Sequence, residues 1–218
     1  MDSSKKVTSA PKLIDPMDKD YFSSEADNLR DYLYALKHGK VLGHPYLGAD
    51  LVSYRNNYRV LDHNQKKVVY LMKWETRKFL GREAAYQVLV WSDPRTDKMR
   101  GYAPQVFFDQ LFSKTGLICT DRIQTPQGSR FWTSVISRAL GFGFFAYFAD
   151  LNSHPRQYAP LTQEKFNDLD NKGLIWTRKE KGKGQLLLIS KEPISEIKEP
   201  TISGLENYPT LRSILEED

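Results

Sequence analysis

The chain has 218 residues, of which 40% are hydrophobic and 12% aromatic, and its formal net charge is +5. This composition excludes a largely disordered chain, and the length suits one domain with appended segments. No apolar run is long enough to span a membrane, the N-terminal residues lack the apolar core of a signal peptide, and the single cysteine, Cys119, cannot form an internal disulfide. We therefore expect a cytoplasmic protein that does not associate with membranes.

Charge and composition divide the chain into three parts. Residues 1–19 predict a flexible N-terminal arm, and residues 191–218, rich in Pro, Glu and Ser, predict an acidic tail with a net charge of −4. The body at 20–190 then carries about +8, and no linker divides it. A basic body beside an acidic tail indicates an anionic ligand or partner, but it does not separate nucleotide, nucleic acid and acidic protein.

The first half of the body predicts a helix followed by three strands. Apolar residues at near-helical spacing (Leu29, Tyr32, Leu33 and Leu36) predict a helix from about residue 23 to His38, which Gly39 ends. Strand-like runs follow at 58–62, 68–74 and 84–91. The segments between these runs are short enough for antiparallel hairpins.

The second half alternates helices and strands. A helix is predicted from Pro104 to Ser113, with Gly116 as its C-cap, and a later one has Thr125 as N-cap and Pro126 at its first position. The other predicted elements are strands at 117–121 and 144–151, a helix at 162–172, and a final hairpin formed by 174–177 and 185–189.

A loop between a strand and a helix is the most informative segment. It reads Lys98-Met99-Arg100-Gly101-Tyr102-Ala103 and lies between the strand at 84–91 and the helix opened by Pro104. Backbone N–H groups at a helix N-terminus favour phosphate, and a glycine allows close approach to it. Taken alone, the same residues also fit an ordinary basic loop before a core helix.

The order of elements and this loop together resemble the GNAT superfamily of acyl-CoA-dependent N-acyltransferases, across roughly residues 25–150. The signature of that family begins with Arg or Gln, then has two residues, Gly, one residue, and Gly or Ala. In this chain Lys98 takes the first place, Gly101 the glycine and Ala103 the final small residue. The resemblance implies an α/β fold whose mixed sheet has antiparallel N-terminal strands and a splayed parallel pair, flanked by helices.

The resemblance also implies a mechanism. The strands at 84–91 and 117–121 would be parallel and diverge, with the pantetheine arm of acetyl-CoA, or another acyl-CoA, along the first of them. Backbone N–H groups near Leu89, Val90 and Trp91 would polarise the thioester, and the pyrophosphate would rest on 99–103. An amine on a small molecule or a protein would attack directly in a ternary complex, without a covalent enzyme intermediate.

Two departures from the family pattern bear on catalysis. Lys98 replaces Arg or Gln, and the tyrosine that often protonates the thiolate is absent from the region Ser129-Arg130-Phe131-Trp132. Asp121, at the end of its predicted strand, Glu75 and Tyr147 are the candidates for proton transfer. A salt bridge would also explain Asp121, and a core position would explain Tyr147. No spacing of His, Cys and Asp predicts a metal site.

Two other functions stay open. A member of the same fold that has lost acyl transfer would act as a protein-binding module, with exposed phenylalanines among Phe79, Phe142, Phe144, Phe145 and Phe148 as its interface. A nucleic-acid-directed acyltransferase or binder would use the basic positions Arg77, Lys78, Arg82, Arg130 and Arg138 and the hairpin tip at 178–183. Because the acidic tail would screen this surface, we expect nucleic-acid binding to be weak.

Overall fold

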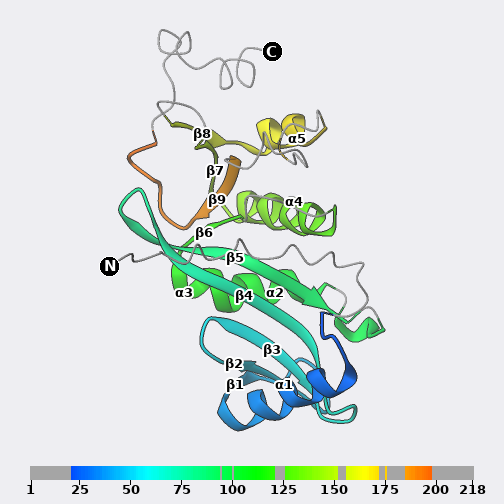
Figure 1. The fold of residues 1–218 in the computed structure, drawn as a ribbon. Coiled ribbons are helices and arrows are strands. Elements are labelled where there is room, and N and C mark those ends of the chain that lie inside the picture. The colour runs from blue at the N-terminus through cyan, green and yellow to red at the C-terminus, as the bar shows by residue number, and fades with distance from the viewer. Residues whose placement is uncertain are drawn as a thin grey trace, which may run out of the picture.

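One mixed sheet of nine strands runs through the described chain, in the order β1-β2-β3-β4-β5-β6-β9-β7-β8 (Figure 1). The computed structural model describes residues 21–93, 95–99, 101–120, 126–151, 156–171, 175 and 185–197. The strands are β1 (Lys40–Gly43), β2 (Ala49–Ser53), β3 (Asn57–Asp62), β4 (Lys67–Phe79), β5 (Arg82–Ser92), β6 (Leu117–Cys119), β7 (Phe145–Asp150), β8 (Gln157–Leu161) and β9 (Gln185–Ser190). Only β5 and β6 pair in parallel; the other described pairs are antiparallel.

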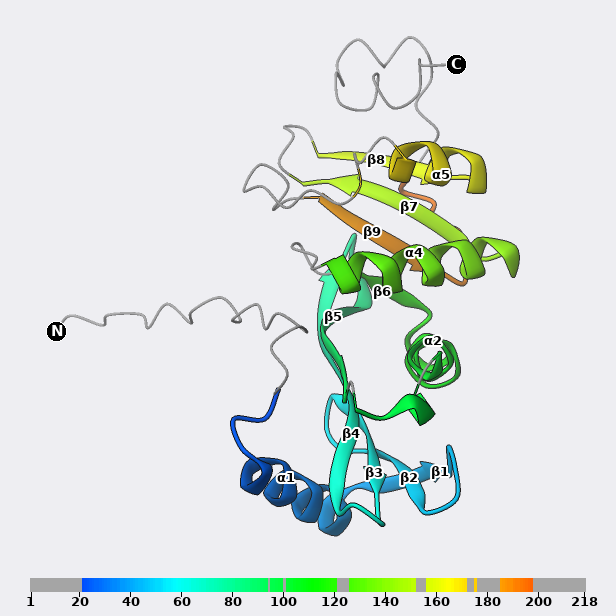
Figure 2. The same cartoon turned by 90° about the vertical axis from the view of Figure 1, so that its right-hand side faces the viewer.

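Helices cover both faces of this sheet. They are α1 (Glu25–His38), α2 (Tyr102–Val106), α3 (Ser113–Thr115), α4 (Pro126–Gly141) and α5 (Gln163–Asn171), with a π-helical turn at Phe107–Phe112 that joins α2 to α3. Residues of α2, α4 and α5 pack in the largest core cluster, whereas α1 packs in a separate cluster. Accordingly, α1 and α2 lie on opposite sides of the sheet (Figure 2). None of the described helices is long and apolar enough to cross a membrane.

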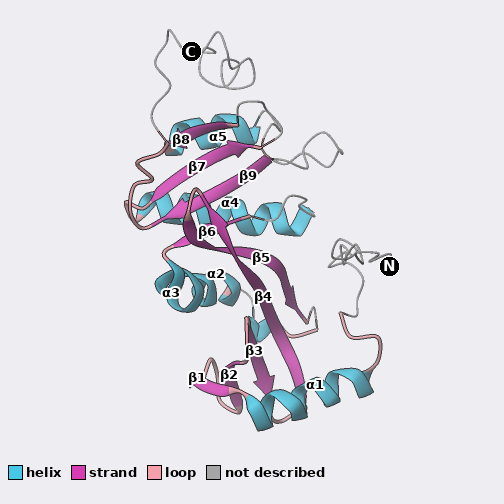
Figure 3. Ribbon diagram, turned by 60° about the vertical axis from the view of Figure 1, so that its left-hand side comes forward, coloured by secondary structure: helices cyan, strands magenta, loops and turns pink. Residues whose placement is uncertain are grey.

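The fold class expected from the sequence is therefore confirmed as a mixed α/β sheet with antiparallel N-terminal strands and a parallel pair, flanked by helices. The long β4–β5 hairpin joins the two halves of the sheet (Figure 3). The predicted strands at 58–62, 68–74 and 84–91 correspond to β3, β4 and β5. The sequence patterns missed β1, β2 and β8, which have only four or five residues each.

The second strand of the predicted final hairpin is present as β9, which pairs with β6 on one side and with β7 on the other. The first predicted strand is the segment 174–177. Of that segment only Ile175 lies within the described residues, and the predicted basic tip lies outside them.

The first helix begins and ends close to where its sequence signals place it. Ser24 is the N-cap, its side chain accepts a hydrogen bond from the N–H of Asp27, and Gly39 follows the last turn. The buried face carries Asn28, Tyr32 and Ala35. The leucines at 29, 33 and 36 instead face outward, with exposed fractions of 41%, 53% and 47%.

Specific hydrogen bonds account for this orientation of α1. The Asn28 amide donates to the carbonyl of Val68 at 3.1 Å and accepts from the N–H of Val68 at 2.7 Å. The Tyr32 hydroxyl lies 2.9 Å from Nδ1 of His63. Because a buried polar group is costly unless it is bonded, these contacts fix which side of the helix meets the sheet.

The described core continues past the expected end of the body at residue 190. Ile194 and Ile197 are 1% and 8% exposed, and they pack with residues of β6, β7 and β9. The N–H of Ile194 donates to the Tyr147 hydroxyl at 2.9 Å. The start of the segment expected to be a tail is thus anchored on the sheet; residues 1–20 and 198–218 lie outside the described residues.

Candidate functional site

The parallel strands β5 and β6 pair over a very short distance. Their register joins Ala85 to Ile118 and Tyr86 to Cys119, and no further pair forms between them in the described residues. The next residue, Thr120, turns to β9: its N–H donates to the Leu187 carbonyl at 2.9 Å, and its hydroxyl accepts from the Leu187 N–H at 3.0 Å. β5 stays with β4 as far as Ser92. The two strands therefore diverge after Tyr86. Beyond that residue, the edge of β5 that faces β6 has no described strand beside it.

A β-bulge interrupts β5 just inside this opening. Lys73 of β4 lies opposite Leu89 and Trp74 lies opposite Gln87, so Val88 has no partner on β4. An extra residue of this kind bends the strand and changes the direction of the neighbouring backbone groups, and bulges are frequent beside active sites. The bulge directly precedes Leu89, Val90 and Trp91, whose backbone the resemblance assigns to the thioester.

The two faces of β5 differ at these positions. Val90 packs against the cluster that contains Val106 and Phe107 of the α2 segment. Leu89 and Trp91 instead pack in the α1 cluster, and Trp91 is only 4% exposed. The predicted role of these residues therefore depends on their backbone. The N–H of Asp93 donates to Val69 of β4, so by alternation Leu89 and Trp91 also face β4, and Val90 faces the edge on the side of β6.

The loop after β5 leads to a helix N-terminus without a side-chain cap. Gly101 is the N-cap residue, with φ of 75° and ψ of −2°, and as a glycine it provides no side-chain cap. The helix continues without a break through the π-helical turn to Thr115. Since Pro104 has no N–H, the first-turn donors are those of Tyr102 and Ala103.

The geometry of Gly101 leaves space beside the helix. A Cβ atom at Gly101 would meet nothing within 4 Å, so the position is open as well as left-handed. The ring of Tyr102 packs edge-on to that of Tyr70, with centroids 6.2 Å apart, and Tyr102 lies against the core together with Ala103. The bulky side chain at 102 is thus directed toward the core.

The other predicted phosphate ligands are placed differently. Met99 is 3% exposed and belongs to the core, so only its backbone is available. Lys98 is exposed, and its Nζ lies 4.7 Å from the centroid of the Tyr46 ring. Arg100 lies outside the described residues.

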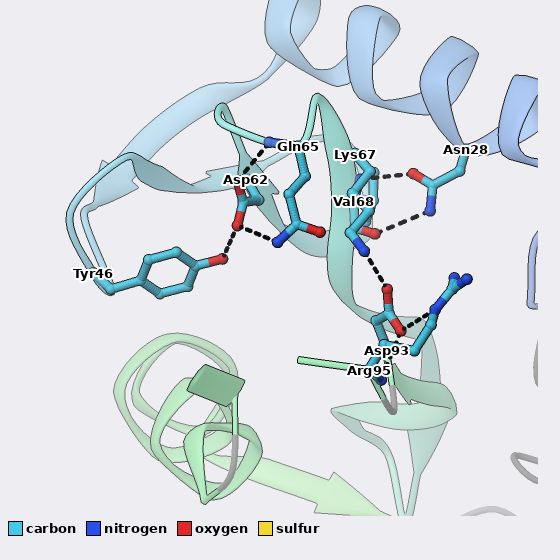
Figure 4. Close-up of polar contacts among 8 residues, drawn as sticks. All are labelled: Asn28, Tyr46, Asp62, Gln65, Lys67, Val68, Asp93 and Arg95. Carbon is cyan, nitrogen blue, oxygen red and sulfur yellow. Dashed lines mark hydrogen bonds and ion pairs between the residues drawn. The ribbon is translucent and has the colours of Figure 1, made fainter. Parts of the chain in front are cut away.

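A buried carboxylate fixes the beginning of this loop. Asp93 is 1% exposed; its carboxylate accepts from Lys67 Nζ at 2.8 Å, from the N–H of Arg95 at 2.9 Å and from Arg95 Nε at 3.1 Å (Figure 4). Burial alone would raise the pKa of Asp93, but the hydrogen bonds from Lys67 and Arg95 outweigh it, and the pKa is lowered. The loop is therefore attached to β4 through a charged contact that the sequence patterns did not reveal.

The predicted base Glu75 lies on β4 directly opposite Tyr86, at the base of the opening. Its carboxylate accepts from Arg77 Nε at 3.1 Å, and the Arg77 guanidinium lies 5.3 Å from the centre of the Tyr86 ring. Tyr86 also contacts Cys119 across the parallel pair, and burial raises the pKa of the Cys119 thiol to about 12. Cys119 is thus a neutral thiol near pH 7, which removes it as a nucleophile.

Of the three predicted proton-transfer residues, only Glu75 and Tyr147 lie within the described part of the chain, and they are on different strands. Tyr147 is 4% exposed in a cluster on β7, where its hydroxyl bonds Ile194. Asp121 lies outside the described residues and follows Thr120 in the sequence. Sequence reasoning missed Tyr86, because its position at the end of the parallel pairing depends on the register between β5 and β6.

No family model matches this chain, and no curated protein shows significant similarity to it. Within the described ranges, no group of three or more His, Cys, Asp or Glu side chains is placed to hold a metal ion. The feature of the chain that bears most on function is therefore the geometry around β5.

Proposed function

We propose that this chain transfers an acyl group, in the simplest case acetyl, from acyl-CoA to an amine by direct attack in a ternary complex. One observation carries the proposal: from the bulge at Val88 to Ser92, the edge of β5 that faces β6 has no strand beside it among the described residues, and it leads through a short loop to a helix N-terminus at Gly101. An extended chain can hydrogen-bond to such an edge as an added strand, and the helix N-terminus favours an anion. Acyl-CoA combines these two features in one molecule.

The binding mode follows from this arrangement. The pyrophosphate would accept from the N–H groups of Tyr102 and Ala103, with positive charge supplied by Lys98 and Arg100. The pantetheine arm would lie along Leu89–Trp91 as an added strand. Because pairing with β6 fills the edge up to Tyr86, the thioester would stop near the bulge. The N–H of Asp93 donates to Val69 of β4, so by strand alternation Leu89 and Trp91 also face β4, and the backbone N–H of Val90 is the one that would stabilise the oxyanion.

The reaction then requires two proton transfers. The lone pair of the amine forms a C–N bond to the thioester carbonyl carbon, and the C–S bond breaks as the tetrahedral intermediate collapses. Glu75 is our candidate to accept the proton from nitrogen, with Asp121 as the alternative. Tyr86, at the base of the opening, is our candidate to give a proton to the departing thiolate.

Calorimetry on the full-length chain tests the donor site. Acetyl-CoA and desulfo-CoA should both bind, and Gly101→Glu should abolish binding, because it puts a carboxylate where the pyrophosphate is expected. Gly101→Asn is the matched control, since asparagine tolerates the left-handed backbone without adding charge, and it should keep most of the affinity. Equal CoA binding by wild type and a folded Gly101→Glu variant, or no binding by wild type, would overturn the proposal.

A second candidate, a protein-binding module without acyl transfer, is favoured by one observation. The outward face of α1 exposes Leu29, Leu33 and Leu36, a contiguous apolar stripe at helical spacing. Of the phenylalanines expected to form an interface, only Phe142 and Phe145 are exposed, at 62% and 39%. CoA binding without turnover of any amine would favour this candidate.

A further inference from the structure

A cavity of about 590 Å³ lies on the side of β5 opposite to Gly101. The N-terminal turn of α1, the turn between β3 and β4, and the end of β5 enclose it, and its walls include Phe22, Lys66, Lys67, Trp91 and Arg95. Trp91 packs with α1, while the neighbouring Val90 packs with the α2 segment. The volume is within the range of sites that hold small organic molecules.

The walls of this cavity are held in place before any ligand binds. Asp93, whose side chain is fully buried, bonds both Lys67 and Arg95 and so fixes two cations at the wall (Figure 4). The paired hydrogen bonds between Asn28 and the backbone of Val68 attach α1 to β4 beside them. A site that is ordered in advance loses less entropy when a ligand binds.

The chemistry of the walls indicates an anion with an apolar body. Among the described residues that line the cavity, three are cations, Lys66, Lys67 and Arg95, and one is a carboxylate, Glu25. Even after Asp93 offsets one charge, the wall stays positive. The apolar part consists of Phe22 and Trp91, whose rings meet edge to face with centroids 5.5 Å apart, and of Leu29.

We propose that this cavity binds the acyl acceptor, and that the acceptor is a small amine that also carries a carboxylate or phosphate group. The inference rests on the proposed acyl transfer. Leu89 and Trp91 turn their side chains toward α1, so a molecule in the cavity approaches β5 from the face opposite to the CoA loop. Its amine forms the new C–N bond and loses a proton, while the thioester sulfur leaves and gains one. The anionic group remains against Lys66 and Arg95.

The test uses matched pairs of amines with the full-length protein and acetyl-CoA. The pairs are L-phenylalanine with phenethylamine, L-leucine with isoamylamine, and phosphoethanolamine with ethanolamine, and N-acetylated product is measured by mass spectrometry. We expect at least one anionic member to exceed its neutral partner in kcat/KM by about tenfold or more, as a charge-assisted contact would give. The phosphate pair distinguishes the two anion types. Neutral amines that react equally well, or no reaction of any anionic amine while CoA binds, would overturn the inference.

Two variants locate the effect. Lys66→Glu should raise the KM of the preferred amine by about tenfold without changing the affinity for CoA. Arg95→Gln should raise the KM as well, and its CoA affinity is measured alongside because Arg95 also bonds Asp93 at the start of the CoA loop. Lys40→Glu, an exposed lysine on β1, is the charge-matched control and should change neither. Unchanged KM in both cavity variants would contradict the inference. If the wild type did not bind CoA, that result would instead contradict the proposed function. Failure of the inference and failure of the proposed function are therefore distinguishable.

Discussion

The two faces of β5 near its C-terminal end are built in different ways. Toward α2, fully buried aromatic residues such as Phe107, Phe112 and Trp132 fill the space beneath the helices. Toward α1, the strand borders the 590 Å³ cavity, and a second cavity of 630 Å³ lies along α1 beside Lys73 and Arg59. One face thus fixes the backbone, and the other leaves room for a ligand.

This difference would allow β5 to hold two substrates, one along its edge and one beside the face that packs toward α1. Close packing on one side holds the bulge and the free N–H groups in position, which electrostatic stabilisation of an oxyanion requires. Space and charge on the other side admit a second substrate. Each prediction below tests one side of this division.

The largest effect is expected at Glu75, the candidate base on β4 opposite Tyr86. Glu75→Gln should lower the acyl-transfer rate by about 10²–10⁴ with little change in CoA affinity, as loss of a positioned base does. Glu83→Gln, an exposed residue near the start of β5, is the control. Asp121→Asn tests the alternative base in the same assay, and full activity in Glu75→Gln with a loss in Asp121→Asn would transfer the role to Asp121.

The attachment of the loop at Asp93 comes next. Asp93→Ala should lower the free energy of unfolding by about 3 kcal/mol, because Lys67 loses its buried partner and the N–H of Arg95 loses its acceptor. Chemical denaturation measures the change, with the exposed Glu192→Ala as a control expected to stay within about 0.5 kcal/mol. A loss as small as that of the control would mean that the contact does not hold the loop.

On the packed upper part of the sheet, Tyr147→Phe should affect stability and leave catalysis unchanged. Its hydroxyl accepts the N–H of Ile194 within the core, so its removal should cost about 1–3 kcal/mol of unfolding free energy. The rate at saturating substrates should not change. A rate loss of more than about tenfold in a variant that keeps its stability would restore Tyr147 as a catalytic residue.

Lowering the pH should weaken the attachment of the loop at Asp93 and so lower the free energy of unfolding. The pKa of Asp93 is lowered in the folded chain, so its contribution to stability is present above the usual pKa of 3.8 and is lost as pH falls below it. Wild type should therefore lose stability more steeply than Asp93→Asn between about pH 5 and 3. Parallel pH curves for the two proteins would contradict this assignment.

Local signals in the sequence were sufficient for much of the fold. Ser24 and Gly39 marked the ends of α1, the short turns between β3, β4 and β5 indicated hairpins, and the glycine at 101 adopts the left-handed backbone at a helix start. In each case a residue type has a conformational preference that neighbours do not override.

The remaining features depend on contacts between distant residues. Both faces of α1 carry residues at helical spacing, so the pattern did not show that Asn28 and Tyr32, and not the leucines, meet the sheet. Insertion of β9 between β6 and β7 is a pairing over many residues that no local pattern records. The bulge at Val88 and the contacts of Asp93 likewise arise only from register and loop path.

Hydrogen exchange measured by mass spectrometry, with and without acetyl-CoA, shows whether acyl-CoA binds along β5 and at the N-terminus of α2. If acyl-CoA lies along the edge of β5 that faces β6, the amides of Val90 and Ser92, which face that edge, and those of Tyr102 and Ala103 should exchange more slowly in the complex, while those of β2 and β3 stay unchanged. Binding that leaves the β5 edge unprotected, or that protects only the cavity beside α1, would contradict the account.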